Sequence, residues 1–192
     1  MLGEPTELVK AKLADRLNDL TRQYIERSPF VCVATGRPDG GMDVSPRGDP
    51  PGFVRVRDRR TVLLPDRRGN NRIDSLRNIV RDPRISLLFM IPGIDNTLRI
   101  NGRAEIVTDA EVLASFAVAD KVPKSVLVVG VERIYFQCPK ALVRSRLWSK
   151  EAQIARSELP STGAILESLS KGAIDGAAYD RGYPQRLKET IY

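Results

Sequence analysis

The chain has 192 residues, of which 42% are hydrophobic and 29% are charged. This mixture is typical of a globular protein and argues against a disordered chain or a membrane protein, so one globular domain is expected. The 31 Lys and Arg residues against 24 Asp and Glu give a net charge of +7, and histidine is absent. Without histidine, the sequence excludes histidine-assisted nucleophiles, imidazole zinc sites and haem with a proximal histidine, so any enzymatic chemistry would depend on a cofactor.

The sequence predicts a cytoplasmic protein with no membrane partner and no metal site. No apolar stretch approaches the ~20 residues that a membrane helix requires, and the N-terminal segment is charged from Glu4 onward. Cys32 and Cys138 lie far apart and outside any metal-ligand spacing, which suits a reducing compartment.

One helix followed by short strands is expected in the first third of the chain. Apolar residues recur at steps of three and four over residues 6–27, which predicts an amphipathic helix. Residues 30–35 are apolar and end at the turn-forming sequence GRPDGG, so they predict a buried strand with residues 42–46 as its hairpin partner. Two more strands are expected at 52–57 and 61–65, on either side of a polar turn.

Hydrogen-bond donors are concentrated behind the strand at 61–65. Residues 63–79 contain four arginines and three asparagines, and a helix is expected to begin at Asn70 or Asn71. Because a helix start exposes unpaired N–H groups and the positive end of the helix dipole, this turn could hold an anion such as a phosphate. Alternatively, Asn71 only caps the helix and the arginines are solvated, or the cluster binds nucleic acid.

Most of the net positive charge is concentrated in one segment of the chain. Between Asp43 and Arg84 there are eleven arginines and six aspartates, so 11 − 6 = +5 of the +7 lies in this segment. The segment has no lysine, and planar arginine forks suit fixed recognition of one anion better than loose binding of a polyelectrolyte. Aromatic residues make up only 6% of the chain and do not interleave with a basic strand, which argues against a nucleic-acid partner.

Strands are predicted again in the second half of the chain, and its last residues are predicted to be helical. Strands are expected at 84–91 and at 97–107, where apolar and polar residues alternate. Thr108 lies three residues before Glu111, a capping-box signature that predicts a helix over 108–118. The last segments expected are a strand at 125–137, a helix at 138–148, and weaker helical segments at 153–158 and 163–169.

Six or seven short antiparallel strands with flanking helices favour a mainly β fold, a small closed β-barrel, over an open sheet with exposed edges. The expected organisation is a single domain, with an N-terminal helix at 1–28, the barrel at 29–148 and a helical tail at 149–192. A barrel offers a ligand site at its mouth or at a seam between two copies.

The order of motifs resembles that of the pyridoxamine 5′-phosphate oxidase-like, FMN-binding split-barrel superfamily. The resemblance covers residues 30–148 and rests on the ordered segments MDVSPRGD, TVLLPDRRGNNRIDSLRNI, DPRISLLF and TLRINGRAEI. The segment CPKALVRSRLW is similar to a branch of predicted flavin-nucleotide-binding proteins within that superfamily. The resemblance implies FMN as the cofactor, a six- to seven-stranded antiparallel split barrel, and a homodimer whose flavin sites are built from both chains.

The resemblance also implies the residues of the site. The segment matching MDVSPR lines the flavin ring, the strand end matching LLPD contributes backbone near it, and the donors at the helix start hold the phosphate. A residue at the start of TLRINGRA reaches the flavin of the partner subunit. The implied cofactor-binding residues are Val44, Ser45, Pro46, Arg47, Leu64, Pro65, Asp66, Asn70, Asn71 and Arg72, together with Asn96 or Thr97.

Arg47 is expected to face the polar edge of the flavin and to stabilise the anionic reduced ring. The alternative is a salt bridge to Asp43 or Asp49, because a buried charge needs a partner. No catalytic residue is assigned. The residues expected on the open, substrate side of the flavin are Lys140, Arg144 and Trp148, unless they are only helix surface and an apolar anchor.

The expected function is an FMN-dependent oxidoreductase acting on a small molecule, with NADH or NADPH as a candidate electron donor. The alternatives are a flavin carrier without turnover and a deazaflavin-dependent reductase. True oxidases of the superfamily carry a lysine and a hydroxyl residue in the phosphate turn and use arginine and histidine for pyridoxal phosphate. This chain has NNR there and no histidine, which argues against oxidation of vitamin B6.

Overall fold

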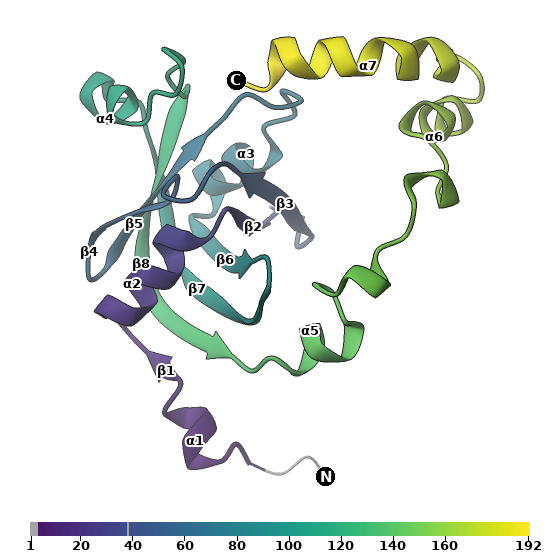
Figure 1. The fold of residues 1–192 in the computed structure, drawn as a ribbon. Helices are drawn as coiled ribbons and strands as arrows, with labels where there is room; N and C mark the ends of the chain where they lie inside the picture. The colour runs from purple at the N-terminus through teal and green to yellow at the C-terminus, as the bar shows by residue number, and fades with distance from the viewer. Residues whose placement is uncertain (1–3, 38) are drawn as a thin grey trace. The chain divides into compact units, whose positions relative to one another are not determined.

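The structure, a computed structural model, describes residues 4–37 and 39–192. Its contacts divide the chain into two compact units, the first ending at Trp148 and the second comprising Ser149–Tyr192 (Figure 1). The division falls where the sequence analysis separates the barrel from the helical tail. Within the described ranges, no helix combines the length and the apolar character needed to span a membrane.

One antiparallel sheet forms the first unit. Its main strands are β2 (Phe30–Gly36), β3 (Met42–Gly48), β4 (Arg55–Asp58), β5 (Thr61–Asp66), β6 (Arg84–Ile91), β7 (Ile94–Val107) and β8 (Ser125–Gln137). Their order is β3-β2-β6-β7-β8-β5-β4, and the short β1 (Leu13–Ala14) pairs with β8. The predicted antiparallel sheet is confirmed. Its order begins at β3 and ends at β4, and among the described residues no ladder joins these two strands.

The core lies on one face of this sheet because side chains alternate along each strand. Val31 and Val33 of β2 and Leu87 of β6 are fully buried there. Two helices, α2 (Asp19–Arg27) and α3 (Asp74–Arg81), add one buried isoleucine each to the same cluster. The apolar runs of the sequence thus become the inner face of the sheet, with helices packed against it (Figure 1).

The predicted single helix at 6–27 is wrong. The segment forms the four-residue helix α1 (Glu7–Lys10), then β1, and then α2. A capping box between Asn18 and Thr21 begins α2, while β1 takes its backbone hydrogen bonds from β8. Pairing with a distant strand therefore overrides the apolar periodicity, which is only a weak preference.

Two other predicted helices have different ends. Helix α4 (Ala110–Ser115) is capped by Asp109, whose side chain accepts hydrogen bonds from two backbone N–H groups, so Thr108 is not its cap. Helix α5 (Lys140–Ser145) is shorter than the predicted 138–148 because Arg146 adopts a left-handed conformation with φ of 53°. Such a conformation ends a helix.

Two strand starts also differ from the prediction. Strand β4 begins at Arg55 rather than at residue 52, after the buried residues Phe53 and Val54. Strand β7 begins at Ile94, three residues before the predicted start, because β6 and β7 form a tight hairpin.

The second unit, called the tail unit below, is helical. It contains two short 3₁₀-helices, η1 (Lys150–Ala152) and η2 (Arg156–Glu158), and two α-helices, α6 (Thr162–Leu169) and α7 (Gly176–Thr190). Helix α6 matches the predicted 163–169, whereas α7, which contains Pro184, lies in a segment where no helix was predicted. Asp175 begins α7 by accepting a hydrogen bond from the N–H of Ala178.

Candidate functional site

Strand β3 presents alternate residues to opposite faces of the sheet. Ser45 and Arg47 lie directly opposite the core valines of β2 and share their inner face. Val44 and Pro46 are on the outer face, where Val44 is 65% exposed. The four residues predicted to line a flavin ring are therefore divided between two faces.

Arg47 meets Asp66, at the end of β5, on the inner face. The distance from Nη2 of Arg47 to Oδ1 of Asp66 is 3.7 Å, and the two side chains are only 22% and 19% exposed. Arg47 also donates a hydrogen bond to Oγ of Ser45 and one of 3.0 Å to the carbonyl oxygen of Pro46. Two residues from separate predicted segments thus form one partly buried ion pair.

An unusual polar environment surrounds the carboxyl of Asp66. Burial raises the pKa of Asp66 above its ordinary value, and the positive charges of Arg47 and Lys124 offset only part of this effect. Directly opposite, on β8, Oγ of Ser125 is buried without a hydrogen-bond partner among the described residues. Because buried hydroxyls are normally hydrogen-bonded, this unpaired one is available to a polar group of a ligand. The inner-face residues Arg47, Asp66 and Ser125 therefore fit a polar ligand edge that both donates and accepts hydrogen bonds.

We expect the substitution Ser125→Ala to raise the free energy of unfolding of the ligand-free protein by about 1 kcal/mol, because it removes a buried polar group that lacks a partner. Ser28→Ala is the matched control. Ser28 is fully buried and donates a 2.7 Å hydrogen bond to the carbonyl oxygen of Met90, so its loss should destabilise the protein. Urea denaturation measures both changes. Equal destabilisation by the two substitutions would show that Ser125 has a partner in solution.

A second ion pair joins the ends of β3 and β5. Nε of Arg67 lies 2.8 Å from Oδ2 of Asp49, and the two side chains are 15% and 4% exposed. Arg67 also donates a 2.8 Å hydrogen bond to the carbonyl oxygen of Phe116. Although Arg67 belongs to the basic cluster of the sequence, these contacts give it a structural role.

The loop between β5 and α3 carries the predicted phosphate donors. Asn70, Asn71 and Arg72 are exposed, but α3 begins only at Asp74, so the prediction that Asn70 or Asn71 opens the helix is wrong. The N-cap residue is Ile73, which is left-handed with φ of 52° and provides no side-chain cap. A helix start without a side-chain cap leaves backbone donors open to an anion.

Arg72 already has an anionic neighbour in this loop. Its Nε lies 2.7 Å from Oδ2 of Asp74, and its backbone N–H donates to Oδ1 of Asn70 at 3.0 Å. Its side chain is 74% exposed, so the ion pair with Asp74 is open to solvent. A phosphate bound here would compete with Asp74 for the guanidinium.

Two polar contacts hold α3 beside the sheet. Ser75 donates a 3.0 Å hydrogen bond to Oδ2 of Asp43 on β3. The buried amide of Asn78 donates a 3.0 Å hydrogen bond to Oγ1 of Thr35 on β2. Asp43 therefore binds α3 rather than Arg47, and the loop of donors is fixed next to β3.

The other two predicted residues of β5 point their side chains into the protein. The side chains of Leu64 and Pro65 are buried, and Leu64 belongs to the core cluster. Their backbone is paired with Leu127 and Val126 of β8, and a contact of this strand end with a ligand stays a prediction.

Asn96 and Thr97 make their contacts elsewhere in the chain. Asn96 donates a 3.0 Å hydrogen bond to the carbonyl oxygen of Gln137, and its own carbonyl accepts one of 2.5 Å from Tyr24. Thr97 is buried beside the side chain of Gln137. In residues 4–37 and 39–192, no recorded hydrogen bond or ion pair links Asn96 or Thr97 to Arg47 or Asp66.

The predicted substrate-side residues lie around α5. Lys140 and Arg144 are exposed on this helix, which contacts β7. Trp148 donates a 3.0 Å hydrogen bond from Nε1 to the carbonyl oxygen of Ile94, in the hairpin between β6 and β7. Trp148 is thus an anchor of the first unit, and no recorded contact brings these three residues to the Arg47–Asp66 pair within the described chain.

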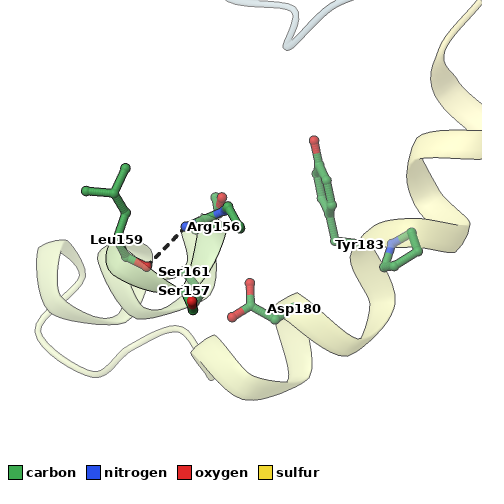
Figure 2. Close-up of a pocket in the computed structure, with 8 residues that line it drawn as sticks. Arg156, Ser157, Leu159, Ser161, Asp180 and Tyr183 are labelled. Carbon is green, nitrogen blue, oxygen red and sulfur yellow. Dashed lines mark hydrogen bonds between the residues drawn. The ribbon is translucent and has the colours of Figure 1, made fainter. Parts of the chain in front are cut away.

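A separate pocket lies in the tail unit (Figure 2). Its charged groups are already engaged within the unit. Asp180 accepts a 2.8 Å hydrogen bond from the N–H of Gly163, and Arg156 donates to the carbonyl oxygens of Leu159 and Pro160. None of the predicted site residues lines it. The described part of the chain also contains no cluster of three or more His, Cys, Asp or Glu side chains suited to a metal ion. The candidate site is therefore the one between β3, β5 and α3.

The first unit is thus a mixed α/β fold in which an antiparallel sheet carries a donor-rich strand-to-helix loop beside an inner-face ion pair. The sequence profile of the family described as pyridoxamine 5′-phosphate oxidase matches residues 17–138, which is more than half of the chain. The chain therefore belongs to the pyridoxamine 5′-phosphate oxidase-like, FMN-binding split-barrel family. No curated protein matches the chain.

Solved structures share the fold. HupZ of Group A Streptococcus has a TM-score of 0.50 and 24% identity, and the alignment covers 62% of this chain and 93% of HupZ. A candidate pyridoxamine 5′-phosphate oxidase of Lactobacillus delbrueckii has a TM-score of 0.51 and 18% identity, covering 64% of this chain and 95% of that protein. The family match ends at residue 138, so it does not include the tail unit.

Proposed function

We propose that this protein binds FMN at the site between β3, β5 and α3 and acts as an FMN-dependent oxidoreductase on a small molecule. The observation that carries the proposal is the grouping of Arg47, Asp66 and Ser125 on the inner face, where the Ser125 hydroxyl has no hydrogen-bond partner among the described residues. Membership in an FMN-binding family agrees with this grouping. We also propose that the sheet closes into the split barrel of this family, and that the chain belongs to the flavin-nucleotide-binding branch within it.

Each residue would hold one part of the cofactor. Asn70, Asn71 and Arg72 would bind the phosphate together with the open N–H groups at the start of α3. Arg47 would donate to a carbonyl of the ring's polar edge and favour negative charge there, while the carboxylate of Asp66 would accept from a ring N–H. Bound FMN would supply the electron-transfer chemistry.

We expect the protein to bind FMN more tightly than riboflavin, because the donors of the loop act on the phosphate. Arg72→Ala should weaken FMN binding by about 1.5–3 kcal/mol, the range for hydrogen bonds to charged groups, and should leave riboflavin binding unchanged. Arg68→Ala, at an exposed position of the same loop, is the control. Titration followed by flavin fluorescence measures the affinities. Equal affinities for FMN and riboflavin would remove the phosphate site from the proposal.

Anaerobic reduction separates the enzyme from the alternatives. If the holoprotein is an oxidoreductase that takes electrons from a nicotinamide, NADH or NADPH should bleach the flavin and an added acceptor should restore its colour over repeated cycles. Arg47→Met should slow the reduction because the anionic reduced ring loses a positive neighbour. Failure with both nucleotides would favour a flavin carrier or a deazaflavin-dependent reductase.

We also propose a homodimer formed through the outer face of β3, β2 and β6. Val44 is 65% exposed there and Met42 is 68% exposed, beside the half-buried Cys32 and Leu88. An apolar sheet face of this kind is typical of an interaction surface. In such a dimer, Asn96 or Thr97 of one chain would approach the flavin of the other.

The expected mass in sedimentation is therefore twice 21.4 kDa. Val44→Arg should shift the protein toward the monomer, because it places a charge on an apolar contact surface. A native monomer that binds one FMN tightly would contradict this dimer.

A further inference from the structure

Three polar side chains lie in a row across strands at one end of the inner face. Asp66 of β5 is directly opposite Ser125 of β8 in the ladder, and it faces Arg47 of β3 in the ion pair. Strand β3 pairs with neither β5 nor β8 among the described residues, so Asp66 links the other two side chains. The row therefore runs from Arg47 through Asp66 to Ser125.

Each outer member of the row has an open hydrogen-bond donor. Nη1 of Arg47 donates to Oγ of Ser45 and to the carbonyl oxygen of Pro46. Nη2 has no recorded hydrogen bond within residues 4–37 and 39–192, and it lies 3.7 Å from Oδ1 of Asp66, which is longer than a hydrogen bond. At the other end, Ser125 is only 5% exposed, and its hydroxyl has no partner in the described part of the chain. Both donors are therefore available to a ligand.

The middle member of the row is an acceptor. Burial raises the pKa of Asp66, and the positive charges of Arg47 and Lys124 oppose this rise and favour the carboxylate. An ionised carboxylate only accepts hydrogen bonds. From Arg47 to Ser125, the row thus offers a donor, an acceptor and a second donor.

The complement of this row is a ligand edge with an acceptor, a donor and another acceptor. A cyclic imide has such an edge, because its ring N–H lies between two carbonyl groups. Residues directly opposite in a ladder have Cβ atoms about 4.5–5.5 Å apart, so Asp66 and Ser125 can reach neighbouring groups of one ring. A carboxamide offers only one carbonyl and one amino group, and it would leave a donor of the row unpaired.

We propose that the row recognises a planar cyclic imide and that Ser125 is its specificity-determining residue. Arg47 and Ser125 would each donate to one carbonyl of the imide, and Asp66 would accept from the N–H between them. The proposal rests on the flavin site proposed above, since the polar edge of a flavin is such an imide. Because the Ser125 hydroxyl is shielded from water, its hydrogen bond to the ligand would replace no hydrogen bond to solvent.

Methylation of the imide nitrogen tests the central contact. The full-length protein is titrated with FMN and with 3-methyl-FMN, and flavin fluorescence gives the two affinities. We expect 3-methyl-FMN to bind at least about tenfold more weakly, because it lacks the donor with which the site is built to pair. In Asp66→Ala the two affinities should differ by less than about threefold, because the acceptor is absent as well.

The substitution Ser125→Ala tests the specificity residue. It should weaken FMN binding about tenfold, as expected when a ligand carbonyl loses its donor, while the ligand-free protein loses no stability. Ser28→Ala is the matched control, because the hydroxyl of this buried serine donates to the carbonyl oxygen of Met90, outside the row. Its FMN affinity should be that of the native protein. Equal FMN affinities of the two variants would overturn the role of Ser125.

The ligands also separate this proposal from the proposed flavin function. Tight binding of FMN with equal affinity for 3-methyl-FMN would overturn imide recognition and leave the flavin function standing. If FMN does not bind, uridine 5′-monophosphate is titrated, since its ring carries the same imide. Binding of this nucleotide that N3-methylation weakens at least about tenfold would support imide recognition without a flavin. Failure of both FMN and the uridine nucleotide to bind would overturn the proposal.

Discussion

The substitution Gly102→Ala should lower the free energy of unfolding by about 3 kcal/mol, the upper part of the range for overpacking. A Cβ atom at this position would lie 2.0 Å from the carbonyl oxygen of Gly130, in the paired strand β8. The obstruction is backbone, which cannot move aside as a side-chain end can. Because β7 and β8 form the longest ladder of the sheet, with a register shift at Asn101 and Gly102, the damage would reach its centre. Urea denaturation monitored by far-UV circular dichroism measures the loss.

Gly130→Ala is the matched control for this effect. A Cβ atom there would meet its nearest neighbour, the carbonyl oxygen of Arg103, at 3.6 Å, which is ordinary van der Waals contact. Its cost should be less than about 1 kcal/mol, the span of strand preferences. If both substitutions lower the free energy of unfolding equally, the steric explanation is contradicted, because only Gly102 lacks room for a Cβ atom.

The substitution Arg67→Met should cost about 3 kcal/mol, as expected when one partner of a buried ion pair is removed. The change takes the guanidinium away from the carboxylate of Asp49, whose side chain is only 4% exposed. It also removes the hydrogen bond to the carbonyl oxygen of Phe116, which holds the end of α4. The free energy of unfolding, from urea denaturation, is the measurement.

Two companion variants test why Arg67→Met lowers the stability. Arg84→Met removes an ion pair with Asp82 in which the arginine side chain is 76% exposed, so it should cost less than about 1 kcal/mol. Adding Asp49→Leu to Arg67→Met should recover part of the lost stability, because the buried carboxylate disappears as well. If the double variant is less stable than Arg67→Met, burial of the Asp49 carboxylate without the Arg67 guanidinium is not the reason for the loss.

Local patterns in the sequence already determined the strands. Apolar runs and alternation placed β2, β3, β5, β6 and β8 within two residues of their observed ends, and short connectors gave the antiparallel sheet. The ordered motifs gave the family, which the profile match confirms. These features depend on side-chain periodicity and on turn residues, which act over a few positions of the chain.

Only the tertiary structure decided which polar residues meet. Nothing in the sequence pairs Arg47 with Asp66, Arg67 with Asp49, or Ser125 with the face of Asp66, because these partners lie on different strands whose register fixes the contact. The division of Val44 and Arg47 between two faces, in contrast, follows from the two-residue period of any strand.

The ends of the helices also could not be predicted without the tertiary structure. The strand β1 exists because β8 offers hydrogen-bond partners to a segment that by itself favours a helix. Helix α3 begins at Asp74 rather than at the asparagines that cap helices best, because Asn71 and Ile73 are left-handed, and Ser75 and Asn78 then bind the helix to Asp43 and Thr35 on the sheet. The sequence by itself therefore determined the main strands of the sheet and the family of this protein. Long-range pairing, which has no local signal, decided β1, the helix ends and the polar contacts of the site.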